Sequence, residues 1–240
     1  MENLKKRGFL MDSITCVISA YYGYFDILKW LLQNECEWDD SIFEAAAYYG
    51  NTEVLDWLLR WTRKNNNPYS KNLVPSVAVK PKNVKNTIEL LEWCEKSSCS
   101  LNCAISIVAT KNGNFEALKW LEKTQDGRWI AERSICNIAA SGGYMNILEW
   151  VKTKGLNIDN IINIAASDGQ LEVIEWILKN RIPNNPLISI VCENAIVNGH
   201  LKIFKMLLKN GCEYNLSRCR SLALMYDMTD IVLWIECNLF

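Results

Sequence analysis

A pattern of about thirty residues returns eight times along this 240-residue chain, and this self-similarity constrains the fold more than any other feature. Each copy centres on one residue, here called the anchor. In the six copies whose anchor is glycine, a small residue stands four positions before the anchor, an aliphatic pair four and five positions after it, and a bulky residue at seven. The anchors, which number the repeats one to eight, are Gly23, Gly50, Asn86, Gly113, Gly143, Gly169, Gly199 and Asp227. A period of 26 to 36 residues predicts stacked supersecondary units, none of which can bury its apolar face alone.

The anchor is interpreted as the turn between two helices. Six anchors are glycine, and the weaker copies place Asn86 and Asp227 there. Asn and Asp tolerate the left-handed backbone better than most residues, so both substitutions fit the same turn.

The second helix of each repeat carries a tryptophan in nearly every copy. The positions four, five, eight and nine after the anchor follow helical spacing and predict one buried stripe. The residue at seven is Trp30, Trp57, Trp93, Trp120, Trp150, Trp176, Met206 or Trp234. We expect these indoles at the edge of the stripe, packed against the neighbouring repeat, where removing a buried Trp costs about 3–5 kcal/mol.

Repeat seven resembles the ankyrin family. Gly199-His200-Leu201, Leu207-Leu208 and the segment from Gly211 to Asn215 are similar to the glycine-His-Leu, Leu-Leu and glycine-Ala-Asp-x-Asn segments of that family. Ala139-Ala140 and Ala165-Ala166 are similar to the Ala-Ala that ends its first helix. The resemblance covers roughly residue 12 to the end, and the period and the tryptophans are most similar to the divergent ankyrin arrays of large DNA viruses that infect amoebae.

The chain departs from the family in two respects. The Thr-Pro-Leu-His start of the first helix is absent, with Ile135 to Ile138 or Ile161 to Ile164 in its place, and most periods fall short of the family's 33 residues. The resemblance therefore implies an all-α fold: an ankyrin-like α-solenoid of about eight helix-turn-helix repeats with short or missing β-hairpins. Residues 1–11 are expected to form an N-terminal cap or partial repeat, and residues 12–240 the repeat domain.

An irregular insertion interrupts the repeats at about 64–83. Pro81 lies where the first helix of repeat three should be, and proline is poorly tolerated inside a helix. We expect a long loop here with a displaced helix around Lys71 to Val79.

Composition excludes several classes of protein. A net charge of −1 without a basic cluster argues against a nucleic-acid partner. No apolar run approaches the ~20 residues of a membrane helix, and the first twelve residues do not resemble a signal peptide. An intracellular location, cytoplasmic by default, is expected, or the host cytoplasm if the protein is viral.

The ten cysteines are expected to be reduced and structural. Cys16, Cys136 and Cys192 share the position seven before the anchor, whereas Cys36, Cys99 and Cys212 share the position thirteen after it. Repeat positions of this kind indicate small buried apolar residues, so neither a metal nor a disulfide is predicted. The trio Cys94, Cys99 and Cys103 has no paired fourth ligand nearby.

No catalytic or cofactor motif is present. The chain lacks a phosphate-binding Gly-rich loop, a nucleophile elbow and a zinc-protease motif. His200 is the only histidine, and its place in the glycine-His-Leu segment predicts a structural role. A non-enzymatic protein without a cofactor is therefore expected.

The resemblance implies that the two residues before each turn glycine face a partner. The candidate partner-binding residues are Tyr21, Tyr22, Tyr48, Tyr49, Lys111, Asn112, Ser141, Ser167, Asp168 and Asn198. Four tyrosines in repeats one and two form a predicted aromatic patch, although half of them could pack between helices instead.

The expected function is a protein–protein interaction scaffold, a host-directed adaptor if the protein is viral. Two alternatives remain open. The chain could be a structural component that self-associates through its apolar C-terminal end, or it could carry a small-ligand or enzyme site in the 64–103 region. Neither the partner nor the oligomeric state follows from the sequence.

Overall fold

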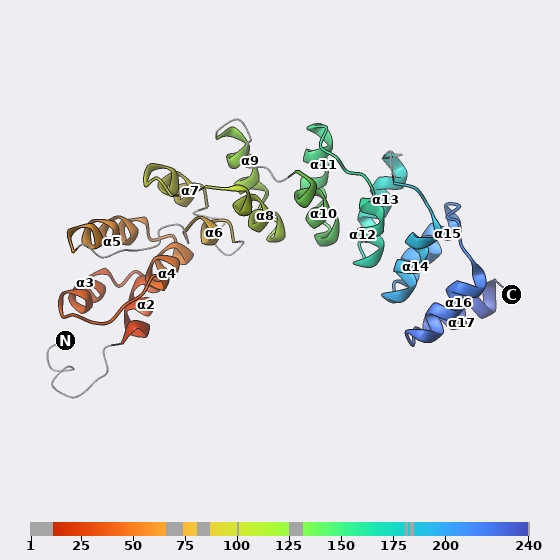
Figure 1. Ribbon diagram of the computed structural model, residues 1–240, viewed down its shortest axis with the longest axis horizontal. Coiled ribbons are helices and arrows are strands. Elements are labelled where there is room, and N and C mark those ends of the chain that lie inside the picture. The colour runs from red at the N-terminus through yellow and green to blue at the C-terminus, as the bar shows by residue number, and fades with distance from the viewer. Residues whose placement is uncertain are drawn as a thin grey trace. The chain divides into compact units, whose positions relative to one another are not determined.

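The computed structural model describes residues 12–65, 74–80, 87–99, 101–124, 132–180, 182 and 185–239. Sixteen α-helices and no strand are formed by these residues (Figure 1). The all-α prediction is thus confirmed for the described residues, whereas the predicted cap at 1–11 lies outside them. The helices divide into two compact units, unit 1 (Met1–Ile130) and unit 2 (Ala131–Phe240).

Unit 1 contains four pairs of helices. The pairs are α2 (Ser13–Tyr22) with α3 (Phe25–Gln33), α4 (Ser41–Tyr49) with α5 (Thr52–Lys64), α6 (Val74–Ala78) with α7 (Thr87–Lys96), and α8 (Cys103–Lys111) with α9 (Phe115–Lys123). The first helices pack in the order α2, α4, α6 and α8, and among the second helices α5 contacts α7 and α7 contacts α9. Each pair therefore leans on the next, as Figure 1 shows for α4 to α9.

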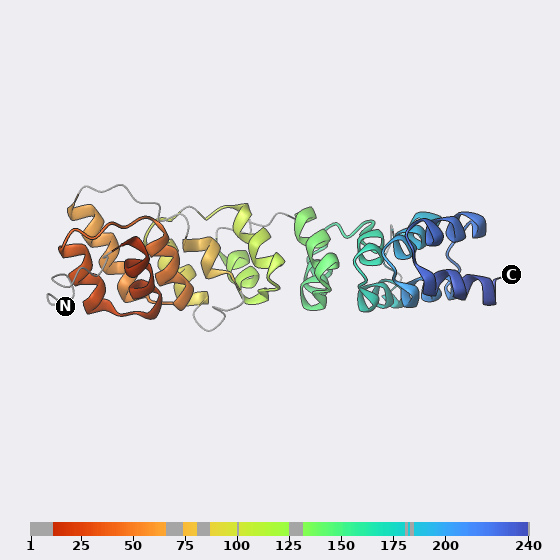
Figure 2. The same ribbon diagram turned by 90° about the horizontal axis from the view of Figure 1, so that it is seen from below.

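Unit 2 repeats this arrangement. Its pairs are α10 (Glu132–Gly142) with α11 (Met145–Thr153), α12 (Ile161–Ser167) with α13 (Leu171–Asn180), α14 (Ser189–Val197) with α15 (Leu201–Lys209), and α16 (Leu216–Met225) with α17 (Thr229–Asn238). The first helices again pack in chain order, α10 on α12, α12 on α14 and α14 on α16. Figure 2 shows these helices side by side, in green to blue.

The anchor turn has the same geometry in all seven repeats in which it is described. The anchor residues have φ between 57° and 83°, the left-handed region that glycine enters without steric cost. The backbone amide of the residue after the anchor donates to the carbonyl of the residue four positions before the anchor, as in His200 N to Ala195 O at 2.8 Å. Asp227, with φ 57°, confirms that Asp can replace glycine here, whereas Asn86 lies outside the described residues.

The small residue four before the anchor is explained by burial. It is alanine in six of the seven described repeats, fully buried in each, and Ser19 in repeat one. The backbone carbonyl of this residue accepts the hydrogen bond of the anchor turn. The helix pair of the next repeat packs over its side chain, so a larger side chain would push the two helix pairs apart.

A second left-handed turn ends the second helix. Glu35, Ser98, Gly155 and Gly211 have positive φ, each twelve residues after its anchor. The following amide donates to the carbonyl five residues back, as in Cys36 N to Leu31 O at 3.1 Å and Cys212 N to Leu207 O at 3.0 Å. Glycine is therefore favoured at this second turn as well in repeats one, three, five and seven, although Glu35 and Ser98 show that it is not obligatory there.

The irregular region retains the packing of a repeat. The five-residue helix α6, within the predicted 71–79, packs on α4, α7 and α8, and Val74, Val77 and Ala78 are buried. It therefore occupies the place of a first helix despite its short length. Thr87 Oγ1 closes this pair by donating to the Ala78 carbonyl at 3.1 Å.

The repeat tryptophans are buried or half-buried, and several reach the preceding repeat. Trp57 lies edge-on to Phe25 with ring centroids 5.6 Å apart, and Trp234 is edge-on to Phe204 at 5.7 Å. Trp93 Nε1 donates to Asp56 Oδ1 at 2.8 Å. The expected packing of indoles between neighbouring repeats is thus present in both units.

Candidate interaction surface

Five tyrosines meet at the anchor turns of repeats one and two. Tyr21 and Tyr22 end α2, Tyr48 and Tyr49 end α4, and Tyr24 follows the first turn. Because α2 packs directly on α4, the two turns lie next to each other. We call these five residues the tyrosine cluster.

The rings of the tyrosine cluster contact one another. Tyr21 stacks on Tyr48, with centroids 5.3 Å apart and planes at 25°, and is edge-on to Tyr22 at 4.9 Å. Tyr22 stacks on Tyr24 at 5.8 Å and approaches Tyr49 at 6.4 Å. Each ring therefore restricts its neighbours, which lowers the conformational entropy that binding would remove.

Burial separates the cluster into a base and a surface. Tyr21 and Tyr48 are half-buried, whereas Tyr22, Tyr24 and Tyr49 remain 53–54% exposed. Both sequence interpretations thus apply: two of the four predicted tyrosines pack between helices, and the other two face solvent. Tyr24 was not singled out from the sequence, because the residue type directly after the anchor differs among the repeats.

An aliphatic row on α2 extends this surface. Ile14 and Ile18 are 63% and 49% exposed and stand about two turns and one turn before Tyr22, respectively, on the same helix face. Their spacing of four residues was visible in the sequence, but their exposure was not.

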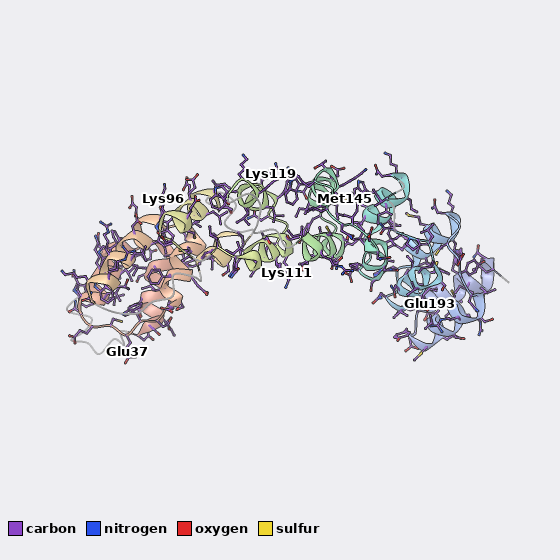
Figure 3. The ribbon with its side chains drawn as sticks, turned by 45° about the horizontal axis from the view of Figure 1, so that its top comes forward. Glu37, Lys96, Lys111, Lys119, Met145 and Glu193 are labelled. Atoms are coloured by element: carbon purple, nitrogen blue, oxygen red, sulfur yellow. The ribbon has the colours of Figure 1, made fainter. Side chains whose placement is uncertain are left out.

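The remaining predicted residues are distributed over other repeats. Lys111 is exposed and ends α8, which is separated from α4 by α6 in unit 1 (Figure 3). The Asn112 amide donates to the Val108 carbonyl at 2.7 Å and so completes the end of α8. Neither residue belongs to the tyrosine cluster.

In unit 2 the predicted residues take part in contacts between repeats. The carbonyls of Ser141 and Ser167 accept hydrogen bonds from side chains of the following repeat, and Asn198 Nδ2 lies 3.3 Å from Ser167 Oγ. Asp168 and Asn198 are exposed. The structure brings Ser167 and Asn198 together, while Ser141 lies one repeat earlier.

The residue after the anchor forms a bridge between repeats that sequence reasoning did not find. We call this hydrogen bond a clasp, because the side chain of one repeat donates to a backbone oxygen of the repeat before it. The clasps are Asn51 Nδ2 to Ala20 O (3.1 Å), Asn114 Nδ2 to Val79 O (3.2 Å), Gln170 Nε2 to Ser141 O (2.7 Å) and His200 Nε2 to Ser167 O (3.0 Å). The predicted structural role of His200 is this clasp.

Eight of the nine cysteines whose side chains the structure describes are buried, and they pack as repeat residues. Cys16 Sγ donates to Cys36 Sγ at 3.4 Å inside repeat one. Burial, followed by this hydrogen bond, raises the pKa of Cys16 to about 12. In repeat seven the hydrogen bond from Cys192 to Cys212 raises the pKa of Cys192 and lowers that of Cys212. The raised pKa values keep Cys16 and Cys192 protonated at neutral pH.

The described part of the chain holds no group of three His, Cys, Asp or Glu side chains that could bind a metal. Cys94 and Cys99 are buried, and the Cys103 side chain lies outside the described residues. No helix among those described is long and apolar enough to cross a membrane.

One buried carboxylate links two repeats of unit 2. Glu193 on α14, labelled in Figure 3, is 8% exposed, and its Oε1 accepts from Arg218 Nε on α16 at 2.7 Å. This hydrogen bond raises the pKa of Arg218. The pair is satisfied internally, so we assign it to packing between repeats.

Comparison of the chain with known protein families and with curated proteins gives no match.

Proposed function

We propose that this chain is an ankyrin-like α-solenoid that acts as a non-enzymatic scaffold and binds a protein partner through the tyrosine cluster. The repeated helix pairs, the recurring left-handed turns and the clasps support the architectural part. The resemblance of repeat seven to the ankyrin family supports the assignment of the repeats.

The observation that carries the functional part is the exposure of Tyr22, Tyr24 and Tyr49 on a base formed by two stacked tyrosines. Tyrosine is enriched at the energetic centres of protein interfaces because it supplies a large, rigid contact area and a hydroxyl group. Ile14 and Ile18 add apolar area beside it. An exposed patch of this composition marks an interaction site more often than chance exposure.

Affinity capture from the native cell, with identification by mass spectrometry, tests the proposal. The bait is the full chain, compared with its Tyr22→Ser and Tyr49→Ser variants. Each substitution should raise the Kd for the captured partner by about tenfold, as expected for an interface hot spot. Helicity should not change, because both side chains face solvent.

Tyr214→Ser provides the matched control, because Tyr214 is also exposed, at 43%, and lies in repeat seven. A partner lost with Tyr22→Ser but kept with Tyr214→Ser supports the tyrosine cluster. Equal capture by all three variants would exclude it.

A second candidate function is self-association through the last repeat. Leu224, Met225 and Leu233 on α16 and α17 are 48%, 75% and 56% exposed. A structural component that assembles through this face would sediment faster as concentration rises, and Met225→Glu with Leu233→Glu would abolish that dependence. A sedimentation coefficient independent of concentration would remove this candidate.

A further inference from the structure

Two of the described tryptophans of unit 1 are not accounted for by the repeat. Trp38 lies in the loop between α3 and α4, and Trp61 lies on α5, four residues after the repeat tryptophan Trp57. Their rings meet edge to face with centroids 5.5 Å apart, and Trp57 stacks on Trp61 at 6.2 Å. Both are half-buried, so indole surface remains accessible.

The two indoles line a cavity of about 820 Å³ that opens to solvent. Buried Leu32 and Cys36 also line it, and the exposed side chains of Glu35, Glu37 and Lys64 surround it. This size falls in the range of small-molecule and side-chain binding sites. The carboxylates of Glu35 and Glu37 have no hydrogen-bond or ion-pair partner among the described residues, and Figure 3 shows Glu37 at the edge of unit 1.

The residues that line the cavity carry a net negative charge, with the carboxylates of Glu35 and Glu37 against the ammonium of Lys64. Residues 12–65, which include both tryptophans, contain nine carboxylates and four basic residues. The ammonium of Lys29 lies 3.7 Å from the centroid of the Phe25 ring. A surface of net negative charge attracts cations, and the faces of Trp rings bind cations best among aromatic side chains.

The backbone at Glu35 adds a further observation. Glu35 has φ 57° at the second left-handed turn, where repeats five and seven have Gly155 and Gly211. A non-glycine residue is less stable in this conformation. The carboxylate at the cavity is therefore present at a position where glycine would favour the fold.

We propose that this cavity binds an organic cation, the ammonium or guanidinium group of a small molecule or of a basic protein side chain. The cation would lie against Trp38 and Trp61, with Glu35 and Glu37 supplying negative charge. The site is distinct from the tyrosine cluster. Cys36 contacts the start of α2, through a hydrogen bond of 3.4 Å to the Asp12 carbonyl, whereas the tyrosine cluster lies at the other end of that helix.

NMR titration of the full chain, observing the tryptophan indole N–H signals, tests the proposal. Choline is the free cation, the N-acetyl methylamides of lysine and arginine represent side chains, and 3,3-dimethylbutanol is the uncharged isostere of choline. Trp38→Phe and Trp61→Phe assign the two signals. We expect saturable shifts of these two signals with at least one cation, weakening as salt is added, and none with the alcohol. The order of affinities identifies the source of the cation.

Substitutions of the carboxylates separate binding from folding. Glu37→Gln should lower the affinity for the cation by about threefold. Glu53→Gln makes the same charge change on the first turn of α5 and should leave the affinity unchanged. Glu35→Gly should raise Tm and still weaken binding, a combination that a purely structural role does not produce. Ser98→Gly, at the equivalent turn of repeat three, should raise Tm without changing the affinity.

Equal shifts with 3,3-dimethylbutanol, the absence of saturation with every cation, or unchanged affinity in both Glu35→Gly and Glu37→Gln would overturn the proposal. Because this site lies apart from the tyrosine cluster, none of these results bears on partner capture. Loss of capture in Tyr22→Ser likewise leaves the cation site untouched.

Discussion

His200 Nε2 lies 3.0 Å from the carbonyl oxygen of Ser167, one repeat earlier in the chain. The imidazole ring occupies the space above Gly169, where an added Cβ would lie 2.8 Å from His200 Cε1. The same relation holds between Gln170 and Gly143, and between Asn51 and Gly23. Glycine is therefore favoured at these three anchors for two separate reasons, the left-handed backbone and the close approach of the following repeat.

These two reasons can be separated by substitution. Gly211 has φ 81° and nothing within 4 Å of an added Cβ, so Gly211→Ala tests the backbone alone and should cost about 1 kcal/mol of unfolding free energy. Gly169→Ala also clashes with His200 and should cost about 1–3 kcal/mol more. Urea denaturation followed by circular dichroism measures both. Equal losses would show that the contact with His200 has no energetic weight.

The clasp itself can be tested at His200. His200→Ala should destabilise the protein by about 1 kcal/mol, because the Ser167 carbonyl loses its partner. His200→Gln should recover most of that loss, because Gln170 makes the equivalent hydrogen bond at 2.7 Å in repeat six. Urea midpoints of the three proteins provide the measurement. If Gln were no better than Ala, ring packing rather than the hydrogen bond would be responsible.

Acid should weaken the start of α2. The Thr15 backbone amide and hydroxyl donate to the Asp12 carboxylate and lower its pKa. A lowered folded-state pKa means that this stabilisation is complete above the unfolded value of about 4 and disappears as pH falls through the folded value. The urea midpoint of Asp12→Ala should therefore lie below that of wild type at pH 7, and the gap should close in acid. Asp12→Asn, whose neutral amide oxygen still accepts from Thr15, should show a smaller gap at pH 7 than Asp12→Ala, and this gap should also shrink as wild-type Asp12 is protonated.

Thiol labelling should distinguish the buried cysteines from Cys237, which is exposed. Cys237 is exposed, whereas burial raises the pKa of Cys16 to about 12 and that of Cys219 to about 11. At pH 8 iodoacetamide should modify Cys237 first, and Cys16 and Cys219 only when their repeats open. Peptide mapping by mass spectrometry reports each site separately. Labelling of Cys16 at the rate of Cys237 in native protein would contradict the burial described here.

The repeat pattern predicted the features that depend on local sequence. The anchors, the small residue before them and the short helix around α6 were all predicted, because left-handed turns and helical spacing depend on residues close in sequence. Asp227 is the clearest case, since its exchange for glycine was interpreted through backbone geometry and its φ is 57°.

Apart from the packing of the repeat tryptophans, the features that join different repeats were not predicted. The clasps use asparagine, glutamine and histidine at one position, and no single residue type marks them. Trp38 and Trp61 stand off the repeat period, so their approach across the cavity follows only from the packing of α3, α5 and the intervening loop. The left-handed Glu35 was likewise hidden, because glutamate carries no preference for that conformation.

Every clasp has the same direction along the chain: the donor belongs to the later repeat and the acceptor to the earlier one. During synthesis, the acceptor carbonyl has therefore already left the ribosome when its donor emerges. Within each unit, the repeat that supplies the acceptor carbonyl is synthesised before the repeat that docks on it. Growth from the N-terminal side follows as the natural order of assembly on the ribosome.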